Sequence, residues 1–186
     1  MICDACLMRL KTQMNDETRK VLYGYRNADN PTHEALAART GLSQYHLREA
    51  MMHLRGTGLI WGRHFYSISS NGRRLIKLLA TADQPEPSER LCDDCLLEIA
   101  NMLPNKRDAY SILDQLMLHH YRTTPDLTAA LGISIYKLRE ISFMLEAVQL
   151  IGCDRGHVYY LRQTGRRLAQ LLEKGQVSHQ PALALT

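Results

Sequence analysis

Apolar side chains spaced three or four residues apart predict a helix near the start of each half of the chain. The first such helix runs over Glu17–Tyr25 and the second over Ala109–Tyr121, and in both the apolar residues fall on one face. A short second helix follows each, over His33–Arg39 and Asp126–Leu131, after threonine or Thr-Pro residues suited to a helix start. The two halves are therefore expected to begin with the same pair of helices.

A glycine, and two residues later a serine, separate the second helix from a third in each half. Gly41 and Gly132 allow the sharp turn, and Ser43 and Ser134 stand where the N-cap of the next helix is expected. The third helix then has one apolar face, made in the first half by Leu47, Ala50, Met51 and Leu54 and in the second half by Leu138, Ile141 and Leu145. This is the spacing of a helix-turn-helix.

Short apolar runs around a glycine-containing turn follow the third helix in each half and predict a β-hairpin. The predicted strands and turns are Leu59–Trp61, Gly62-Arg63 and His64–Ile68 in the first half, and Leu150–Cys153, Asp154–Gly156 and His157–Leu161 in the second. Each tip carries an arginine beside a glycine, Arg63 and Arg155, which suits contact with the negative potential of a DNA minor groove. An ordinary surface turn with a solubilising charge explains either tip equally well.

Three matching blocks in the same order show that the chain contains an internal repeat. Cys3–Leu7 matches Cys92–Leu96, Gly41–Glu49 matches Gly132–Glu140, and Gly72-Arg73-Arg74-Leu75 matches Gly165-Arg166-Arg167-Leu168. The Pro- and charge-rich segment 80–91 lies between the copies and is expected neither to continue a helix nor to contribute to a core. We therefore predict a first repeat over residues 1–79, a linker over 80–91, a second repeat over 92–175 and a flexible tail over 176–186.

Composition and charge favour a globular protein with a polyanionic partner for its first half. The chain has 186 residues, of which 45% are hydrophobic, and no run long enough to cross a bilayer, so we expect a cytoplasmic protein without a membrane partner. Residues 1–88 carry 12 Lys and Arg against 8 Asp and Glu, a net charge of +4, whereas residues 89–186 carry 11 against 11, a net charge of zero. Basic side chains that neutralise phosphates release counterions, so the charge of the first half fits a polyanion such as nucleic acid, and an ordinary solvated surface is the alternative.

Two cysteine pairs, Cys3 with Cys6 and Cys92 with Cys95, have the spacing of zinc knuckles. Because structural zinc takes four ligands, we expect the two repeats to join their pairs into one four-cysteine zinc site. Two chains sharing ligands, reduced thiols packed at a helix start, and a redox dithiol remain alternatives. Cys153 lies in a predicted strand and is expected to act as a small hydrophobic residue.

The residues after the third helix resemble a known family. Leu54–Ile60 reads Leu-x-x-x-Gly-Leu-Ile, and Ile68–Leu75 is similar to the Leu-Thr-x-x-Gly-Arg-x-Leu sequence that begins the last helix of MarR-like winged helix-turn-helix domains. The resemblance covers about two thirds of each repeat. It implies a mainly α fold with small β-hairpins, built from two tandem winged helix-turn-helix domains, and binding of double-stranded DNA with the third helix in the major groove.

The leading hypothesis is thus a sequence-specific DNA-binding regulator of transcription, of a compactness that suits a phage or plasmid protein and with a nucleoid location. The candidate DNA-binding residues are Gln44, Tyr45, His46, Arg48, Glu49, Arg63, Arg73 and Arg74 in the first repeat and Tyr136, Lys137, Arg139, Arg155, Arg166 and Arg167 in the second. Tyrosine and arginine on an exposed helix face suit phosphate and guanine, although an ordinary solvated helix can carry both.

Two departures and one alternative function qualify this hypothesis. Gln149 replaces Gly58, and Arg162 replaces the cap-forming Ser69, so the geometry of the second copy is less regular than that of the first. The 12-residue linker can span roughly 40 Å, enough for the repeats to occupy half-sites about 34 Å apart, and a homodimer is also possible. A tandem winged-helix scaffold that binds transcription or replication machinery is the alternative. Motifs for a phosphate-binding loop or a hydrolase nucleophile are missing, so we expect no enzyme.

Overall fold

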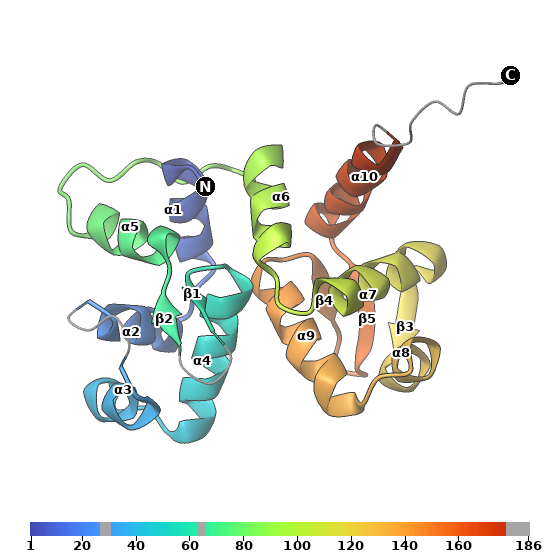
Figure 1. Ribbon diagram of the computed structural model, residues 1–186, viewed down its shortest axis with the longest axis horizontal. Helices are drawn as coiled ribbons and strands as arrows, with labels where there is room; N and C mark the ends of the chain where they lie inside the picture. Colours follow the sequence, from blue (N-terminus) through green and yellow to red (C-terminus); the bar gives the residue numbers. More distant parts are fainter. Residues whose placement is uncertain (27–30, 63–65, 178–186) are drawn as a thin grey trace, which may run out of the picture.

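The computed structural model describes residues 1–26, 31–62 and 66–177, and its element order repeats once along the chain (Figure 1). The first repeat contains α1 (Asp4–Thr12), α2 (Asp16–Gly24), α3 (His33–Thr40), α4 (Gln44–Gly56), β1 (Ile60–Trp61), β2 (Ser67–Ile68) and α5 (Ser70–Leu79). The second contains α6 (Asp93–Met102), α7 (Lys106–His119), β3 (Tyr121–Thr123), α8 (Thr124–Leu131), α9 (Ile135–Ala147), β4 (Ile151–Cys153), β5 (Val158–Leu161) and α10 (Gln163–Val177). A mainly α fold with small β-hairpins, as the sequence predicted, is confirmed.

Each repeat has helices on both sides of the predicted three. Each cysteine pair lies at the start of a helix: Cys3 and Cys92 are the N-caps of α1 and α6, and the second cysteine of each pair lies in the first helical turn. The last helices, α5 and α10, follow the hairpins. α10 extends to Val177, so the predicted tail begins inside a helix, and residues 178–186 lie outside the described part of the chain.

Local hydrogen bonds fix where the helix-turn-helix elements begin. Ser43 and Ser134 cap α4 and α9 as predicted, each accepting a hydrogen bond from the backbone N–H three residues on. α8 begins at Thr124, two residues before the predicted start, because Thr123 and Asp126 form a capping box. The glycines between the second and third helices, Gly41 and Gly132, adopt left-handed φ angles of 68° and 61°.

The hairpins are small antiparallel ribbons, and that of the second repeat gains an unpredicted strand. β1 pairs with β2 through Ile60 opposite Ile68. In the second repeat, β5 lies between β4 and β3. The side chain of Asp154 orders the second tip by accepting hydrogen bonds from the N–H groups of Gly156 and Val158, both at 2.9 Å. The first tip includes Arg63, which lies outside the described residues.

The glycine shared by the two Gly-Arg-Arg-Leu blocks allows the last helix to approach the hairpin closely. A Cβ atom at Gly72 would lie 2.2 Å from the carbonyl oxygen of Leu59, and one at Gly165 would lie 2.0 Å from that of Leu150. Neither distance is compatible with a side chain. The motif therefore records a packing constraint that both repeats share.

The two repeats pack against each other through α4 and α9, the third of the predicted helices in each repeat (Figure 1). The buried residues form one continuous core. Gly56 of α4 lies so close to α9 that a Cβ atom there would be 2.7 Å from the carbonyl oxygen of Met144. Nearby, Arg55 is only 9% exposed and forms an ion pair of 3.0 Å with Glu140 across the seam. Because a buried guanidinium needs a partner, this ion pair fixes how the helices cross.

The segment between the repeats is tied to both of them. Residues 80–91 contain no helix or strand, as predicted. The expectation that this segment contributes nothing to the core is wrong at Leu91, which is 4% exposed. Leu91 takes the place before the cysteine pair that the fully buried Ile2 takes in the first repeat. The backbone N–H of Ser88 also donates to the carbonyl of Ala5 at 3.1 Å. Across the described residues, all helices are too short or too polar to cross a membrane.

The irregular positions of the second repeat keep the backbone path of the first. Gln149 adopts φ 57°, close to the 69° of its counterpart Gly58, even though the left-handed region is unfavourable for residues with a Cβ atom. At the start of the last helix, Ser69 accepts a hydrogen bond from the N–H of Gly72, whereas its counterpart Arg162 has no side-chain acceptor with which to make such a cap. Packing thus imposes the backbone geometry of the first repeat on a sequence that is locally less suited to it.

Replacing Gln149 with glycine should stabilise the protein. We expect Gln149→Gly to raise the free energy of unfolding by about 1 kcal/mol, because the left-handed conformation then costs nothing. Urea denaturation followed by circular dichroism measures the change. As the matched control, Gly58→Ala should destabilise, since its Cβ atom would lie 2.5 Å from the Met102 methyl group. A destabilised Gln149→Gly variant would show that this backbone position carries no strain.

Candidate metal centre and nucleic-acid interface

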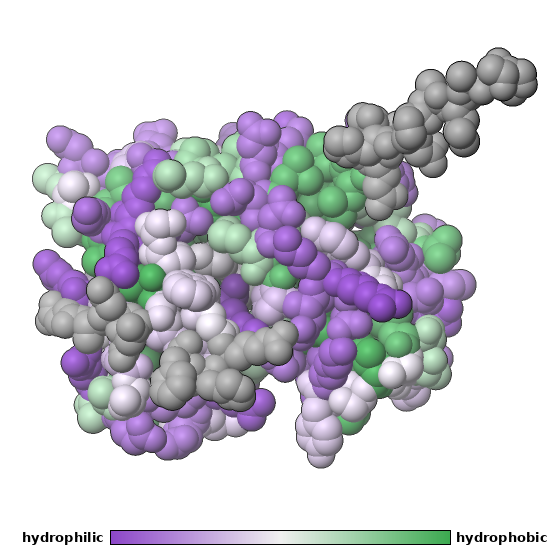
Figure 2. Space-filling view, in the orientation of Figure 1, coloured by the Kyte–Doolittle hydropathy of each residue, from purple (hydrophilic) through white to green (hydrophobic). Residues whose placement is uncertain are grey.

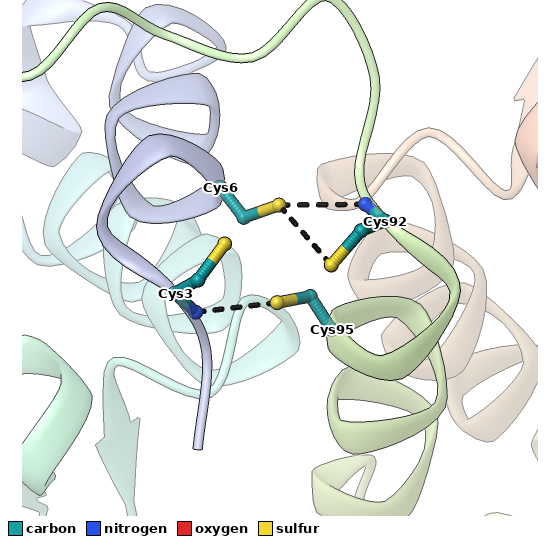
Figure 3. Close-up of side chains that lie close together, drawn as sticks. All are labelled: Cys3, Cys6, Cys92 and Cys95. Atoms are coloured by element: carbon teal, nitrogen blue, oxygen red, sulfur yellow. Dashed lines mark hydrogen bonds between the residues drawn. The ribbon is translucent and has the colours of Figure 1, made fainter.

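The four predicted cysteines come together between the starts of α1 and α6 (Figure 3). Cys3 and Cys6 project from the start of α1, and Cys92 and Cys95 from the start of α6, so that all four sulfur atoms lie within 4.8 Å of one another. All four are free thiols rather than disulfides. The cluster forms within one chain, as the sequence predicted for an intrachain site.

Hydrogen bonds around the cluster follow the symmetry of the repeat. The backbone N–H of Cys3 donates to Sγ of Cys95 at 3.2 Å, and the N–H of Cys92 donates to Sγ of Cys6 at 3.4 Å. Interchanging the two repeats turns each of these bonds into the other, so the cluster has local two-fold symmetry. The hydroxyl of Ser88 adds a contact of 3.6 Å to Sγ of Cys6. Donors directed at sulfur stabilise thiolates, the form that binds a metal ion.

The arrangement fits a tetrahedral zinc ion. Zinc–sulfur bonds of about 2.3 Å place the sulfur atoms of a tetrahedral site about 3.8 Å apart. The Sγ atoms of Cys6 and Cys92 are 3.8 Å apart, and the remaining pairs lie within 4.8 Å. Four sulfur ligands complete the coordination of zinc, so such a site holds structure together and leaves no position for a substrate.

Burial makes the cluster depend on a compensating charge. Burial raises the pKa of the Cys6 and Cys95 thiols above their ordinary value. Burial also acts to raise the pKa of Cys3, but hydrogen bonds within the cluster, first among them one from the Cys6 backbone, outweigh it and lower that pKa. Thiolates packed this closely repel one another, and a bound cation would offset both the repulsion and the loss of hydration.

Two arginines predicted to hold DNA phosphates instead brace the starts of α1 and α6. Arg74 donates to the carbonyl of Ile2 at 2.8 Å and pairs with Asp4 at 2.7 Å. In the second repeat, Arg167 makes the equivalent bonds to the Leu91 carbonyl and to Asp93. Because each aspartate directly follows a cysteine of the cluster, these arginines position the cysteine pairs. Binding phosphate would compete with the bonds that they already make.

Two more candidate DNA-binding residues, at corresponding positions of the two repeats, form ion pairs within the protein and so do not have a simple base-reading role. His46 lies 3.3 Å from Glu17 on α2, and Lys137 lies 2.6 Å from Asp108 on α7. These bonds join the third helix of each repeat to its first core helix at corresponding positions. The acidic partners were not predicted from the sequence, because neither stands in a recognisable motif.

A tyrosine and an arginine on each third helix remain on the surface. Tyr45 is 66% exposed and Tyr136 is 80% exposed, and Arg48 and Arg139 are exposed three residues further on. The other candidates that the structure describes are Gln44, Arg73, Arg155 and Arg166, which are exposed, and Glu49, which is half-buried. Glu49 interacts with the hydroxyl of Tyr45, and this hydrogen bond raises the pKa of Tyr45. Of the predicted set, Arg63 alone lies outside the described residues.

The close packing of α4 and α9 excludes the arrangement in which the repeats occupy separate half-sites. Each third helix has 13 residues and is therefore about 20 Å long. The helices touch near Gly56 and Met144, and both begin at the same edge of the molecule, the lower edge in Figure 1. Their first turns consequently lie closer together than the roughly 34 Å between successive turns of a major groove.

Comparisons with known proteins add little to this geometry. Protein-family models and curated proteins gave no match. Among solved structures, the mRNA-binding domain of elongation factor SelB from E. coli, in complex with SECIS RNA, is 17% identical, with 81% of this chain and 100% of that chain covered and a TM-score of 0.26. The DIP2311 protein from Corynebacterium diphtheriae is also 17% identical, with 78% and 26% covered and a TM-score of 0.28. TM-scores this low do not support an argument about fold or function.

Zinc binding can be tested with single cysteine variants. We expect one zinc ion per monomeric chain by elemental analysis, and loss of that ion in Cys6→Ser together with a fall of several kcal/mol in the free energy of unfolding. Cys153→Ser is the matched control, because Cys153 lies outside the cluster and should leave the zinc content unchanged. One zinc ion for every two chains, or full zinc content in Cys6→Ser, would contradict an intrachain site.

Proposed function

We propose that this chain is a DNA-binding regulator of transcription that contacts duplex DNA with the first turns of α4 and α9. The observation that carries the proposal is the exposed tyrosine and arginine at corresponding positions of both third helices, Tyr45 with Arg48 and Tyr136 with Arg139. Four other predicted contact residues make ion pairs within the protein: His46, Arg74, Lys137 and Arg167. The exposed tyrosines and arginines are therefore a subset of the candidate residues rather than all of the charged surface. Arginine suits guanine in the major groove, and tyrosine suits phosphate or the thymine methyl group.

The relative placement of the helices supports a single binding face. Both third helices begin at the lower edge in Figure 1, and the outline of the molecule is indented between the repeats at that edge in Figure 2. The linker and the starts of α1 and α6, which carry the cysteine cluster, lie toward the opposite edge. A metal ion in the cluster would therefore act at a distance from DNA, by holding the repeats at a fixed angle, and the chain would need no catalytic residue.

A protein-binding scaffold is the second candidate, favoured by one property of the second repeat. Where α4 begins with Gln44, α9 begins with Ile135, which is 40% exposed, beside the highly exposed Tyr136. The charge of residues 89–186 sums to zero, 11 basic against 11 acidic side chains. An exposed apolar pair without excess positive charge suits a protein partner, such as a component of the transcription or replication machinery, better than it suits phosphate.

Substituting single arginines separates base contacts from phosphate contacts. We expect Arg48→Ala to weaken binding to the specific sequence by about 1–3 kcal/mol, because a fork of hydrogen bonds to a base is lost. Arg73→Ala should weaken binding to all sequences alike and flatten the dependence of log K on log salt. Gel-shift titrations on selected and random duplexes at two salt concentrations measure both effects.

The linker provides a control for this experiment. Arg90 is an exposed arginine of the linker, so Arg90→Ala removes the same charge away from the proposed face and should leave binding unchanged. Equal losses on selected and random DNA for Arg48→Ala and Arg73→Ala would show that the assigned roles are wrong. Failure of the wild-type chain to retain any DNA at low salt would instead favour the scaffold.

One chain should protect one continuous DNA site. Because the third helices cannot reach successive major grooves, we expect a footprint of about one helical turn, roughly 10 base pairs, for each chain. Hydroxyl-radical footprinting, together with the mass of the complex in solution, measures the site size per chain. Two protected half-sites separated by a full turn with only one chain bound would contradict the packing of α4 against α9.

A further inference from the structure

A cavity of about 360 Å³ opens at the seam between the repeats, beside the exposed face of α4. Its wall includes Arg48 and Met52 of α4, Tyr66 directly before β2, and Asn105 and Glu140 from the second repeat. Because both repeats contribute side chains, the cavity exists only when α4 and α9 are packed together. Its volume falls at the lower end of the range for small-molecule sites.

We propose that this cavity binds a nucleoside monophosphate, with adenine as the base that fits best. The charges in the wall favour an anion: Glu140 neutralises Arg55 at 3.0 Å, so Arg48 is left to face a phosphate group. A flat surface is available for a base, because the rings of His33 and Tyr66 stack with centroids 5.7 Å apart and an angle of 7°. Met52 adds a polarisable apolar contact.

Asn105 supplies the group that would recognise the base. It occupies the N-cap position of α7 with φ 55°, yet its side chain makes no capping hydrogen bond. An asparagine at an N-cap ordinarily accepts a backbone hydrogen bond, so here the amide is available to the cavity that it lines. A carboxamide offers one donor and one acceptor edge, which matches the N6 and N7 edge of adenine.

The other side of the seam shows that these features are not a general result of duplication. A cavity of about 210 Å³ lies there, lined by Gln13, Phe143 and Glu146 among others. In the alignment of the repeats, Phe143 stands at the position of Met52 and Glu146 at that of Arg55. A carboxylate therefore replaces a guanidinium at this position. The smaller cavity also has Arg162 in its wall, but Glu146 offsets that charge, so no excess positive charge remains for an anion.

The nucleotide could be free in solution or could be an unpaired adenosine of a bound nucleic acid, and two experiments distinguish these sources. In the first, isothermal titration calorimetry measures AMP and ribose 5-phosphate against the full chain. We expect AMP to bind and ribose 5-phosphate to bind at least tenfold more weakly, because only AMP offers a base. In the second, gel shifts compare a duplex containing one unpaired adenosine with the fully paired duplex.

Asn105→Gly is the decisive variant, because glycine keeps the left-handed backbone and removes only the amide. It should weaken AMP binding, or the preference for the unpaired adenosine, at least tenfold, while Gln13→Ala in the smaller cavity changes neither. Affinity for the fully paired duplex should be the same in all three proteins, so this result is independent of the proposed function. Ribose 5-phosphate binding as tightly as AMP, an Asn105→Gly variant that retains full affinity, or no binding in either experiment would each overturn the proposal.

Discussion

Two helix starts meet at one cluster of sulfur atoms, and the relative placement of the repeats depends on that meeting. The backbone N–H groups of Cys3 and Cys92 each donate to a sulfur of the other repeat, so neither half of the cluster is complete alone. Arg74 and Arg167 hold the starts of α1 and α6 in place through their bonds to Asp4 and to the Leu91 carbonyl. A bound metal ion would convert these weak contacts into a cross-link between residues almost ninety positions apart.

The seam between the third helices is the second point at which the repeats are joined. The absence of a side chain at Gly56 lets α4 approach the α9 backbone, and the ion pair of the buried Arg55 with the half-buried Glu140 sets the register of the contact. Since truncating Glu140 would leave the buried guanidinium of Arg55 without this partner, the pair specifies one arrangement rather than simply adding stability. This seam directs the first turns of both helices to one edge and encloses the cavity beside Arg48.

Duplication has left the repeats equal in architecture and unequal in surface chemistry. Their equivalent ion pairs, His46 with Glu17 and Lys137 with Asp108, tie the third helix to the core in both. Their exposed and seam positions differ: Gln44 corresponds to Ile135, and Arg55 to Glu146. The ion pairs that brace the fold are kept in both repeats, and so are the exposed tyrosine and arginine of α4 and α9, whereas other exposed and seam positions differ. The proposed binding of nucleic acid by the first repeat and of a protein by the second is consistent with this difference in surface chemistry.

The sequence alone determined the repeat, the three helices before each hairpin and the two Cys-x-x-Cys pairs. These features depend on periodicity, caps and spacing within a few residues. Ser43 and Ser134 cap their helices as predicted, and all four cysteines converge. The sequence did not reveal that Arg74 and Arg167 serve the cysteine cluster, that Leu91 is buried, or that α4 and α9 touch. Each of these depends on partners 70 or more residues away, or on which face of a helix the other repeat covers, and an exposed arginine and a bracing arginine look identical until the chain is folded.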